Sequence, residues 1–340
     1  MPHKFTNDYN VLIHPRILKA LEINSSTQNI AYGLDSHSQK ASEYIKSIFG
    51  CKDASIHFLA GGTQTNMVMI SSALRSYQGV ISTTTGHINV HETAAIESSG
   101  HKIITVSGRD GKIYPEDIES TMDHYGDEHM VKPGMVYISN STEIGTIYYK
   151  DELINLRKVC DKYNLYLYMD GARLGSALTS KDNNVDPSLL GQVCDAFYIG
   201  GTKNGLLFGE ALVVVNKELQ KDFRYIIKNK GAMLAKGYAL GIQFEEAFKD
   251  GLYFDIAKST NEIADYLKEK LNNIGFLTSK SPTNQIFVKF NNDIAEKIIN
   301  RYSTELWDKG ERESILRFVV SFITTREDVD ELINYLITLL

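Results

Sequence analysis

The chain has 340 residues, a length that suggests one large domain and a smaller one, and its content of 43% apolar and 23% charged residues is typical of a globular protein. Its net charge of −6 argues against a nucleic-acid-binding protein, which needs a basic face to meet phosphates. No apolar run approaches the roughly 20 residues that cross a bilayer, and the polar N-terminus lacks the apolar stretch of a signal peptide, so a membrane or secreted protein is not expected.

The cysteines support the same conclusion about location. Cys51, Cys160 and Cys194 are widely spaced and form neither a metal-ligand pattern nor a disulfide framework. Their neighbours are apolar, so we expect buried, reduced thiols, no bound metal and a cytoplasmic protein.

Short β-prone runs alternate with segments of helix length along the first two thirds of the chain. The runs are residues 80–83, 102–106, 135–138, 165–169, 196–199 and 211–215, and segments such as 66–77, 89–99 and 150–163 lie between many of them. Short apolar strands separated by helices indicate βαβ units and a parallel sheet buried on both faces. We therefore expect an α/β fold with a mostly parallel central sheet between layers of helices.

The pattern changes near residue 230. Residues 236–249 and 258–273 are typical of helices, and residues 285–290 and 315–320 of strands in a separate small sheet. A last helix is expected from Thr324, because Thr324-Thr325-Arg326-Glu327 has the form of a capping box. We predict three regions, which are residues 1–25 as an N-terminal segment that joins the small domain, 26–235 as the large domain, and 236–340 as a smaller C-terminal α+β domain.

An acidic residue closes one of the predicted strands. In Tyr168-Met169-Asp170-Gly171 the apolar run ends on Asp170, and a glycine follows at once. Because α/β proteins bind ligands at the carboxyl ends of their parallel strands, Asp170 is a candidate site residue. A turn aspartate that caps the next helix is about as common, so this segment alone does not decide between the two interpretations.

A lysine in a glycine-rich loop follows the next strand. Gly200-Gly201-Thr202-Lys203-Asn204-Gly205 places Lys203 among small residues, and the glycines let the backbone approach a ligand closely. A lysine in such a pocket loses its proton more easily and can attack an aldehyde. Taken alone, Lys203 is better interpreted as an ordinary loop lysine.

Asp170 and Lys203 together fit one cofactor, pyridoxal 5′-phosphate. This cofactor needs a lysine for its aldehyde and an acidic partner for its ring nitrogen, and neighbouring strand ends can bring both groups to one ring. The chain lacks the GxxxxGK[ST] pattern of a phosphate P-loop and a clean GxGxxG after its first strand, which argues against a nucleotide-binding protein.

Two further turns carry candidates for binding such a cofactor. A predicted strand runs into Gly61-Gly62-Thr63 and then a helix, and free N–H groups at the start of a helix bind anions, so Gly62 and Thr63 are candidates to hold a phosphate. His87 also lies between a strand and a helix, where its ring can stack on a flat cofactor. The other histidines considered are interpreted as ordinary loop residues; they are His91, His101, His124 and His129.

Arg317 lies in the middle of an apolar strand, in Ile315–Val320. A buried, unpaired charge costs several kcal/mol, so this arginine should have an anionic partner. The partner is either a protein carboxylate or the carboxylate of a substrate, and an arginine can bind either one with two hydrogen bonds.

These segments resemble a known family. Asp170-Gly171-Ala172-Arg173-Leu174 resembles the signature of the L-threonine aldolases, within the β-eliminating-lyase group of fold type I pyridoxal-phosphate enzymes. The segment 200–205 resembles the Schiff-base loop of one branch of that family. Other motifs fall in the expected order, so the resemblance covers nearly the whole chain; they are Tyr32-Gly33-Leu34-Asp35, residues 62–66, Gly86-His87 with Glu92, and Arg317.

The resemblance implies a role for each matching position. Lys203 would hold the cofactor as a Schiff base, Asp170 would pair with the ring nitrogen, and Arg173 would lie near the ring hydroxyl. The remaining assignments are Gly62 and Thr63 on the phosphate, Thr202 as a further cofactor-binding residue, His87 stacked on the ring, and Arg317 on the substrate carboxylate with help from Thr6 or Asn7.

The activity implied is cleavage of a β-hydroxy-α-amino acid, L-threonine or L-allo-threonine, to glycine and acetaldehyde. The base that takes the β-hydroxyl proton would be His87 or an ordered water. The resemblance also implies a homo-oligomer, a tetramer built from dimers with active sites at the dimer interface. The rival interpretations are another pyridoxal-phosphate reaction, such as β-elimination, decarboxylation or transamination, and a pyridoxal-phosphate-binding protein without activity.

The sequence departs from the family in two places. Many members carry a histidine in the block that aligns with residues 139–143, and this chain has none there, which leaves the choice between threo and erythro substrates open. The phosphate-binding arginine of some members has no clear counterpart, and Lys230 or Lys236, acting from a partner subunit, is the candidate to replace it.

Overall fold

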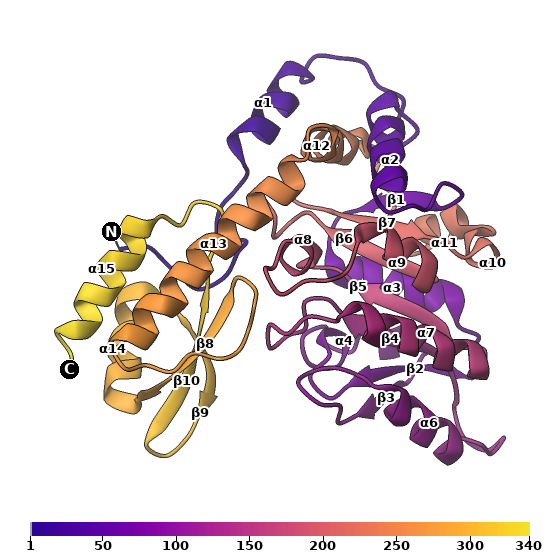
Figure 1. The fold of residues 1–340 in the computed structure, drawn as a ribbon. Coiled ribbons are helices and arrows are strands. Elements are labelled where there is room, and N and C mark those ends of the chain that lie inside the picture. The colour runs from indigo at the N-terminus through magenta and orange to yellow at the C-terminus, as the bar shows by residue number, and fades with distance from the viewer. Residues whose placement is uncertain (1) are drawn as a thin grey trace.

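The computed structural model describes residues 2–340, which form a seven-stranded sheet and a three-stranded sheet with helices around them (Figure 1). The strands of the large sheet are β1 (Ser55–Leu59), β2 (Gln78–Thr83), β3 (Ile103–Val106), β4 (Lys132–Ser139), β5 (Tyr166–Asp170), β6 (Ala196–Gly200) and β7 (Glu210–Val214), and those of the small sheet are β8 (Gln285–Asn291), β9 (Glu305–Lys309) and β10 (Glu313–Val319). The helices are α1 (Pro15–Ile23), α2 (Ser36–Ile48), α3 (Gly62–Ala73), α4 (His87–Val90), α5 (Ala95–Ser98), α6 (Pro115–His124), α7 (Lys150–Tyr163), α8 (Leu174–Leu178), α9 (Pro187–Val193), α10 (Lys217–Gln220), α11 (Phe223–Asn229), α12 (Tyr238–Lys249), α13 (Leu252–Asn273), α14 (Asn292–Tyr302) and α15 (Arg326–Ile337).

The large sheet has the strand order β1-β7-β6-β5-β4-β2-β3 and is mostly parallel, as expected. Strands β3, β2, β4, β5 and β6 pair in parallel, and β7 alone runs antiparallel to both of its neighbours. The parallel strands therefore end at one edge of the sheet, and the loops that follow them carry their polar residues to that edge.

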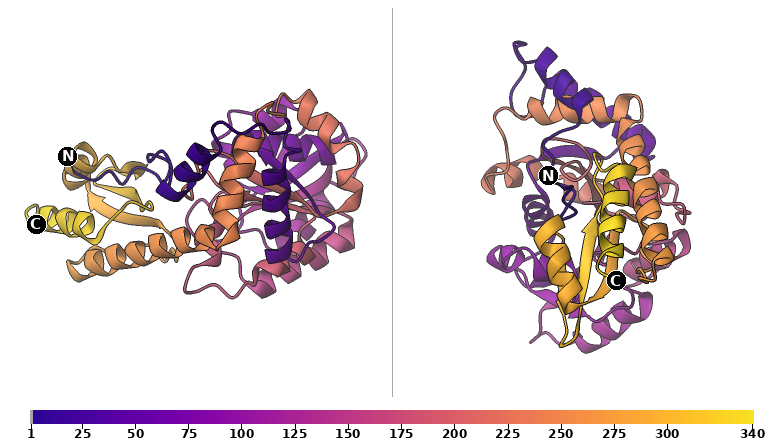
Figure 2. Two further views of the ribbon diagram at one scale, coloured as in Figure 1. Left: turned by 90° about the horizontal axis from the view of Figure 1, so that it is seen from above. Right: turned by 90° about the vertical axis from the view of Figure 1, so that its left-hand side faces the viewer.

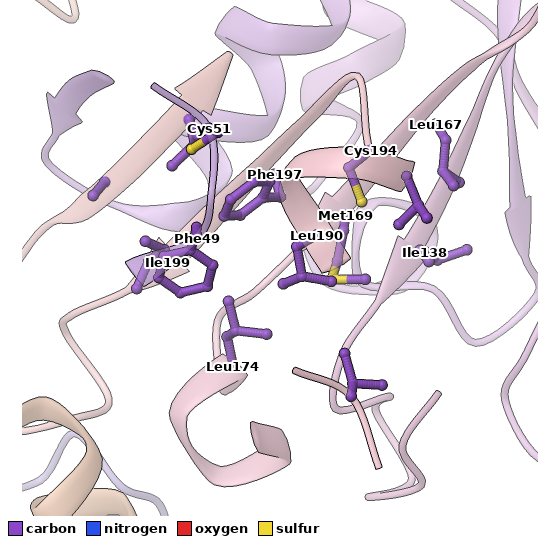
Figure 3. Close-up of a cluster of buried hydrophobic side chains, with 14 of the residues drawn as sticks. Phe49, Cys51, Ile138, Leu167, Met169, Leu174, Leu190, Cys194, Phe197 and Ile199 are labelled. Carbon is purple, nitrogen blue, oxygen red and sulfur yellow. The ribbon is translucent and has the colours of Figure 1, made fainter. Parts of the chain in front are cut away.

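Side chains that alternate along the strands build two separate cores on the two faces of this sheet. On one face, Ile138, Met169 and Phe197 pack with Leu174 and Leu190, as Figure 3 shows. The residues between them point to the opposite face, which helix α3 covers. Tyr137, Tyr168 and Tyr198 lie on that second face, so their hydroxyl groups surround the position where β5 ends.

The small sheet has the order β8-β10-β9 and is antiparallel. It packs against α13, α14 and α15 around a core of its own (Figure 2). The N-terminal segment belongs to this core, because Phe5 is buried there, donates its N–H to the carbonyl of Tyr302 at 3.1 Å and accepts the N–H of Val319 at 2.9 Å. Helix α12 packs on α2 beside the large sheet, and α13 continues from there to the small sheet (Figure 1).

The structure differs from the sequence prediction at several helix ends. The helix predicted over 66–77 spans 62–73, and the one predicted from 258 starts at Leu252. The segment 89–99 is not one helix, because Thr93 and Ala94 adopt left-handed backbone angles that separate α4 from α5.

The last helix starts later than the predicted position at Thr324. Its capping box is formed by Thr325 and Asp328, which exchange hydrogen bonds between side chain and backbone N–H. An aspartate three residues into the helix serves here in place of the glutamate that the pattern suggested. The Thr324 hydroxyl instead accepts the N–H of Ser321 at 3.0 Å.

Two properties of the described chain bear on its environment. No helix within residues 2–340 is both long and apolar enough to cross a membrane. Cys51, Cys160 and Cys194 are buried and free, as the sequence analysis expects.

Candidate active site

A cavity of about 410 Å³ lies between the carboxyl ends of the large sheet's strands and the small sheet. It is lined by Thr6, Asn7, Tyr9, His87, His91, Glu143, Arg173, Lys203, Glu305, Trp307 and Arg317. The structure thus brings together six residues that the sequence analysis selects, from segments as far apart as residues 6 and 317; they are Thr6, Asn7, His87, Arg173, Lys203 and Arg317.

Asp170 is buried at the end of β5 and accepts several hydrogen bonds. The Tyr137 hydroxyl donates to Oδ2 at 2.6 Å, Asn66 Nδ2 donates to the same oxygen at 3.1 Å, and the N–H of Ala172 donates to Oδ1 at 3.0 Å. Burial alone would raise the pKa of Asp170, but attraction to His87 and the hydrogen bonds hold this pKa below its ordinary value. The carboxylate is therefore charged at neutral pH although it is removed from water.

A hydrogen-bonded relay joins Asp170 to His87. Asn66 Nδ2 donates to Glu92 Oε1 at 2.7 Å as well as to Asp170, and the Tyr168 hydroxyl donates to Asn66 Oδ1 at 2.9 Å. Glu92 Oε1 in turn lies 2.8 Å from His87 Nδ1. The buried carboxylate of Glu92 therefore holds the ring of His87 in a fixed orientation through Nδ1.

Glu143 occupies the block in which the sequence analysis notes a missing histidine. Its Oε1 accepts the N–H of His87 at 2.9 Å and the Ser139 hydroxyl at 2.6 Å. Burial raises the pKa of Glu143, and hydrogen bonds, mainly the one from Ser139, offset part of that rise. The loop after β4 thus positions His87 through a carboxylate that also faces the cavity.

Lys203 lies in the loop after β6, with its ammonium nitrogen 5.8 Å from the centre of the Tyr9 ring. Burial lowers the pKa of Lys203, and the positive charge of Arg173 lowers it further. The carboxylates of Asp8, Asp170 and Glu210 act in the opposite direction. The net result is a lowered pKa, so Lys203 gives up its proton to form the nucleophilic amine more easily than an ordinary lysine does.

Glu210, at the start of β7, anchors the loop that carries Lys203. Its two oxygens accept the N–H of Gly201 at 2.9 Å and the Thr202 hydroxyl at 2.8 Å. Thr202 in turn accepts the N–H of Gly209 at 2.9 Å, so its side chain is turned towards Glu210. Burial raises the pKa of Glu210 to about 7, against the opposing effects of these hydrogen bonds and of Lys203.

Arg173 pairs with Asp8 of the N-terminal segment. Nε and Nη2 of Arg173 donate to the two carboxylate oxygens of Asp8 at 2.7 and 3.0 Å. Asn284 Nδ2 donates to Asp8 Oδ2 at 2.9 Å. Burial would raise the pKa of Asp8, but the attraction to Arg173 outweighs it with help from Lys203 and the hydrogen bonds, and the pKa is lowered. This pair joins the end of β5 to the first residues of the chain.

Arg317 lies on β10 and faces the cavity from the small sheet. Its Nη1 donates to Gln285 Oε1 at 3.0 Å, its Nη2 pairs with the Glu305 carboxylate, and its guanidinium carbon lies 5.1 Å from the centre of the Trp307 ring. An anionic partner is predicted for Arg317, and Glu305 is a protein carboxylate that meets this prediction. Nε is buried and has no hydrogen-bond partner within the described residues.

Gly62 and Thr63, the predicted phosphate-binding residues, are not among the residues that line the cavity. Gly62 and Thr63 start helix α3, one turn before Asn66. A Cβ at Gly62 would stand 3.0 Å from the Tyr198 hydroxyl, which itself bonds to Asp170. This close approach explains a glycine at that position. The start of α3 and the Asp170 carboxylate therefore belong to one neighbourhood.

Sequence reasoning missed several of these functional neighbours. His91 lines the cavity, although it looked like an ordinary loop histidine, and the broken helix around Thr93 leaves it there. Asp8, Asn66 and Glu210 carried no local pattern that marks a buried polar residue. The one available signal was that Glu210 precedes an apolar strand, as an acidic residue at a sheet end.

Comparisons with known proteins agree with this geometry. The family model of the β-eliminating lyases matches residues 15–293. A low specificity L-threonine aldolase of a Pseudomonas species is 30% identical over 336 residues, which cover 97% of this chain and 95% of that protein. A low specificity L-threonine aldolase of Saccharomyces cerevisiae is 24% identical over 78% of this chain and 68% of its own length.

Solved structures give the same result. The structure of Leishmania major threonine aldolase superposes with a TM-score of 0.97 at 41% identity, and the match covers 99% of each chain. Aspartate aminotransferase of Thermus thermophilus superposes with a TM-score of 0.73 at 11% identity over 100% of this chain and 92% of that one, which shows a shared fold. With a family model that spans most of its length, this chain belongs to the β-eliminating lyase family.

Proposed function

We propose that this protein is a pyridoxal-5′-phosphate-dependent lyase that cleaves L-threonine or L-allo-threonine to glycine and acetaldehyde. The residues of the cavity fit the cofactor. Lys203 supplies a buried amine of lowered pKa, and Asp170 supplies a buried carboxylate that stays charged. The N-terminus of α3, at Gly62 and Thr63, offers N–H groups for a phosphate.

Each of these groups has a role with the cofactor bound. Lys203 would hold its aldehyde carbon, Asp170 would keep its ring nitrogen protonated, and Arg173 would lie beside its ring hydroxyl. When bound, pyridoxal phosphate withdraws electrons from the substrate's α-carbon. Glu210 would keep the Lys203 loop in place through Gly201 and Thr202, which makes Thr202 a positioning residue as well as a candidate cofactor contact.

Substrate orientation would depend on the small sheet. Arg317 would bind the amino acid's carboxylate, and its unpartnered Nε leaves a donor for that purpose. Thr6 and Asn7 line the same cavity and would add polar contacts. Fixing the carboxylate fixes which bond of the α-carbon stands across the ring, and such positioning is worth about 7–11 kcal/mol in well-oriented reactions.

The β-hydroxyl proton needs an acceptor, and the cavity offers two histidines. Partial burial lowers the pKa of His91, and repulsion from the nearby His87 lowers it further, so His91 is neutral at pH 7 and can accept a proton. His87 is held by Glu92 through Nδ1, which suits a ring that stacks on the cofactor and leaves Nε2 available. We assign the proton transfer to one of these two side chains.

The observation that carries the proposal is the single cavity that unites Lys203, His87 and Arg317 beside the Asp170 carboxylate. The test is a product assay on the purified protein with pyridoxal phosphate and threonine. We expect acetaldehyde and glycine in equal amounts, no turnover with Lys203→Ala, and full turnover with Lys217→Ala, which alters an exposed lysine. Ammonia and a keto acid as the products, or full turnover by Lys203→Ala, would refute the proposal.

We also propose that the protein works in the cytoplasm as a homo-oligomer, a tetramer built as a dimer of dimers. Several large apolar side chains of the first 34 residues are exposed in the single chain; they are Leu12, Leu18, Ile23, Ile30 and Leu34. An apolar surface of this kind is typical of a region that a second subunit covers. Lys236 is exposed and would be free to reach a partner's cofactor phosphate. Light scattering of the eluted protein tests this, and a monomer at micromolar concentration would contradict it.

A further inference from the structure

The ion pair between Glu305 and Arg317 is built into the small sheet. Strands β9 and β10 are antiparallel, and their register places Glu305 directly opposite Arg317. Side chains in that relation point to the same face and lie close enough to pair. The Glu305 carboxylate therefore meets the guanidinium on the face that lines the cavity.

Trp307 closes the other side of this arrangement. It lies at an irregularity in the pairing of β9 with β10, and its contact with Arg317 in the lining of the cavity places it on the same face as Glu305. Its ring centre is 5.1 Å from the Arg317 guanidinium and 5.0 Å from the ring of Phe287. With Gln285 on Nη1, the arginine is almost enclosed, and its side chain is only 12% exposed. Glu305 is the more accessible partner, at 36%.

We propose that Glu305 occupies the anion-binding side of the Arg317 guanidinium until the carboxylate of the amino acid displaces it. This inference rests on the substrate-binding role proposed above for Arg317. Glu305 is then a specificity-determining residue. A carboxylate that binds Nε and Nη2 of Arg317 side by side must take the place of Glu305 on Nη2, and the partly exposed Glu305 can turn into water at little cost. It stays near the cavity after it has left.

A displaced Glu305 selects against one class of ligand. A small monocarboxylate replaces it with no other change of charge. A ligand with a second carboxylate brings that group close to the displaced glutamate and is repelled. The cavity should therefore favour amino acids whose side chain is neutral over those whose side chain is anionic.

Trp307 provides a readout that needs no turnover, because it is the only tryptophan of the chain. The holoenzyme is titrated with acetate, malonate and glycine while its tryptophan emission is followed. Acetate has a carboxylate but no amino group, so it probes the Arg317 site without reaction at the cofactor. Movement of Glu305 beside Trp307 should change the emission in each titration.

The variant is Glu305→Gln, which keeps the size of the side chain and removes its charge. We expect acetate and glycine to bind about three- to tenfold more tightly than to the parent protein. The preference of the parent for acetate over malonate should narrow in the variant. Glu313→Gln is the matched control, because Glu313 lies on β10 but pairs with the exposed Lys289 instead of Arg317. It should bind all three ligands as the parent does.

Failure of this inference can be told apart from failure of the proposed function. Arg317→Gln should weaken the binding of acetate and glycine at least tenfold. If it does not, the role proposed for Arg317 is wrong. If Arg317→Gln weakens binding while Glu305→Gln leaves it unchanged or weakens it, the role of Arg317 stands and displacement of Glu305 is refuted. If the tryptophan emission of a variant does not change during the titration, glycine binding is measured from the visible absorbance of the cofactor instead.

Discussion

The pair between Asp8 and Arg173 is expected to hold the N-terminal segment against the large sheet, and Asp8→Asn tests this. The two side chains are 1% and 12% exposed and share two hydrogen bonds, with a third from Asn284. An asparagine has nearly the same shape, but in either orientation of its amide the Nδ2 group would face an N–H donor of Arg173. The substitution therefore removes the charge and leaves a buried guanidinium without its counter-ion.

The size of the effect follows from burial. Breaking a buried ion pair by removing one partner costs about 3–5 kcal/mol, because the remaining charge is not solvated. Asparagine retains one acceptor oxygen, so we expect a loss of about 3 kcal/mol in the free energy of unfolding. Folding lowers the pKa of Asp8 from 3.8. The contribution of Asp8 to the free energy of unfolding is therefore fully present above pH 3.8, and it is lost as the pH falls through the pKa of Asp8 in the folded protein.

Urea unfolding of the cofactor-free protein, followed by circular dichroism, measures this difference. The loss in the free energy of unfolding of Asp8→Asn, relative to the parent protein, should be present from pH 7 down to pH 5 and should become smaller only below pH 3.8. Glu116→Gln is the control, because it breaks an exposed ion pair with Arg109 and should leave the unfolding midpoint unchanged. A midpoint for Asp8→Asn equal to that of the parent at pH 7 would show that the buried pair does not stabilise the fold.

Two further predictions concern groups in and beneath the cavity. The pKa of Glu210 is raised from 4.5 to about 7, so between these pH values the folded protein binds a proton there that the unfolded chain releases. The free energy of unfolding should therefore fall by on the order of a few kcal/mol as the pH rises from 4.5 to 7. Urea unfolding of Glu210→Gln should not show this dependence on pH. Loss of a general base typically lowers turnover about 10²–10⁴-fold, so either His87→Asn or His91→Asn should lower turnover by that factor. The visible absorbance of each variant should show that pyridoxal phosphate is still bound. Near-parental turnover in both variants would assign the proton transfer to water.

Much of the fold could be predicted because buried parallel strands have a simple signature. The apolar runs at 165–169 and 196–199 correspond to β5 and β6, and their ends carry Asp170 and Lys203. Once the strands are assigned as parallel, topology brings these two residues to one edge without further information. The same reasoning places His87 there, after β2.

Partners of the site residues could not be predicted in the same way. Asp8 and Arg173 are separated by 165 positions, and nothing local in either segment marks the pair. Strand β9 was missed because Glu305–Lys309 is short and mixes charged with apolar side chains without a buried alternation. Its partner β10 was recognised, so the arginine was predicted to need an anion while the glutamate that meets it remained hidden.

The cavity wall joins two ends of the chain that are made at different times. Asn7 is made well before Arg317, and at about 5–20 residues per second roughly 15–60 s separate the two residues. During that interval the first strands can fold, but Phe5 has no core to enter, because β10 does not yet exist. The N-terminal segment therefore stays undocked, and accessible to chaperones and proteases, until β10 has been made.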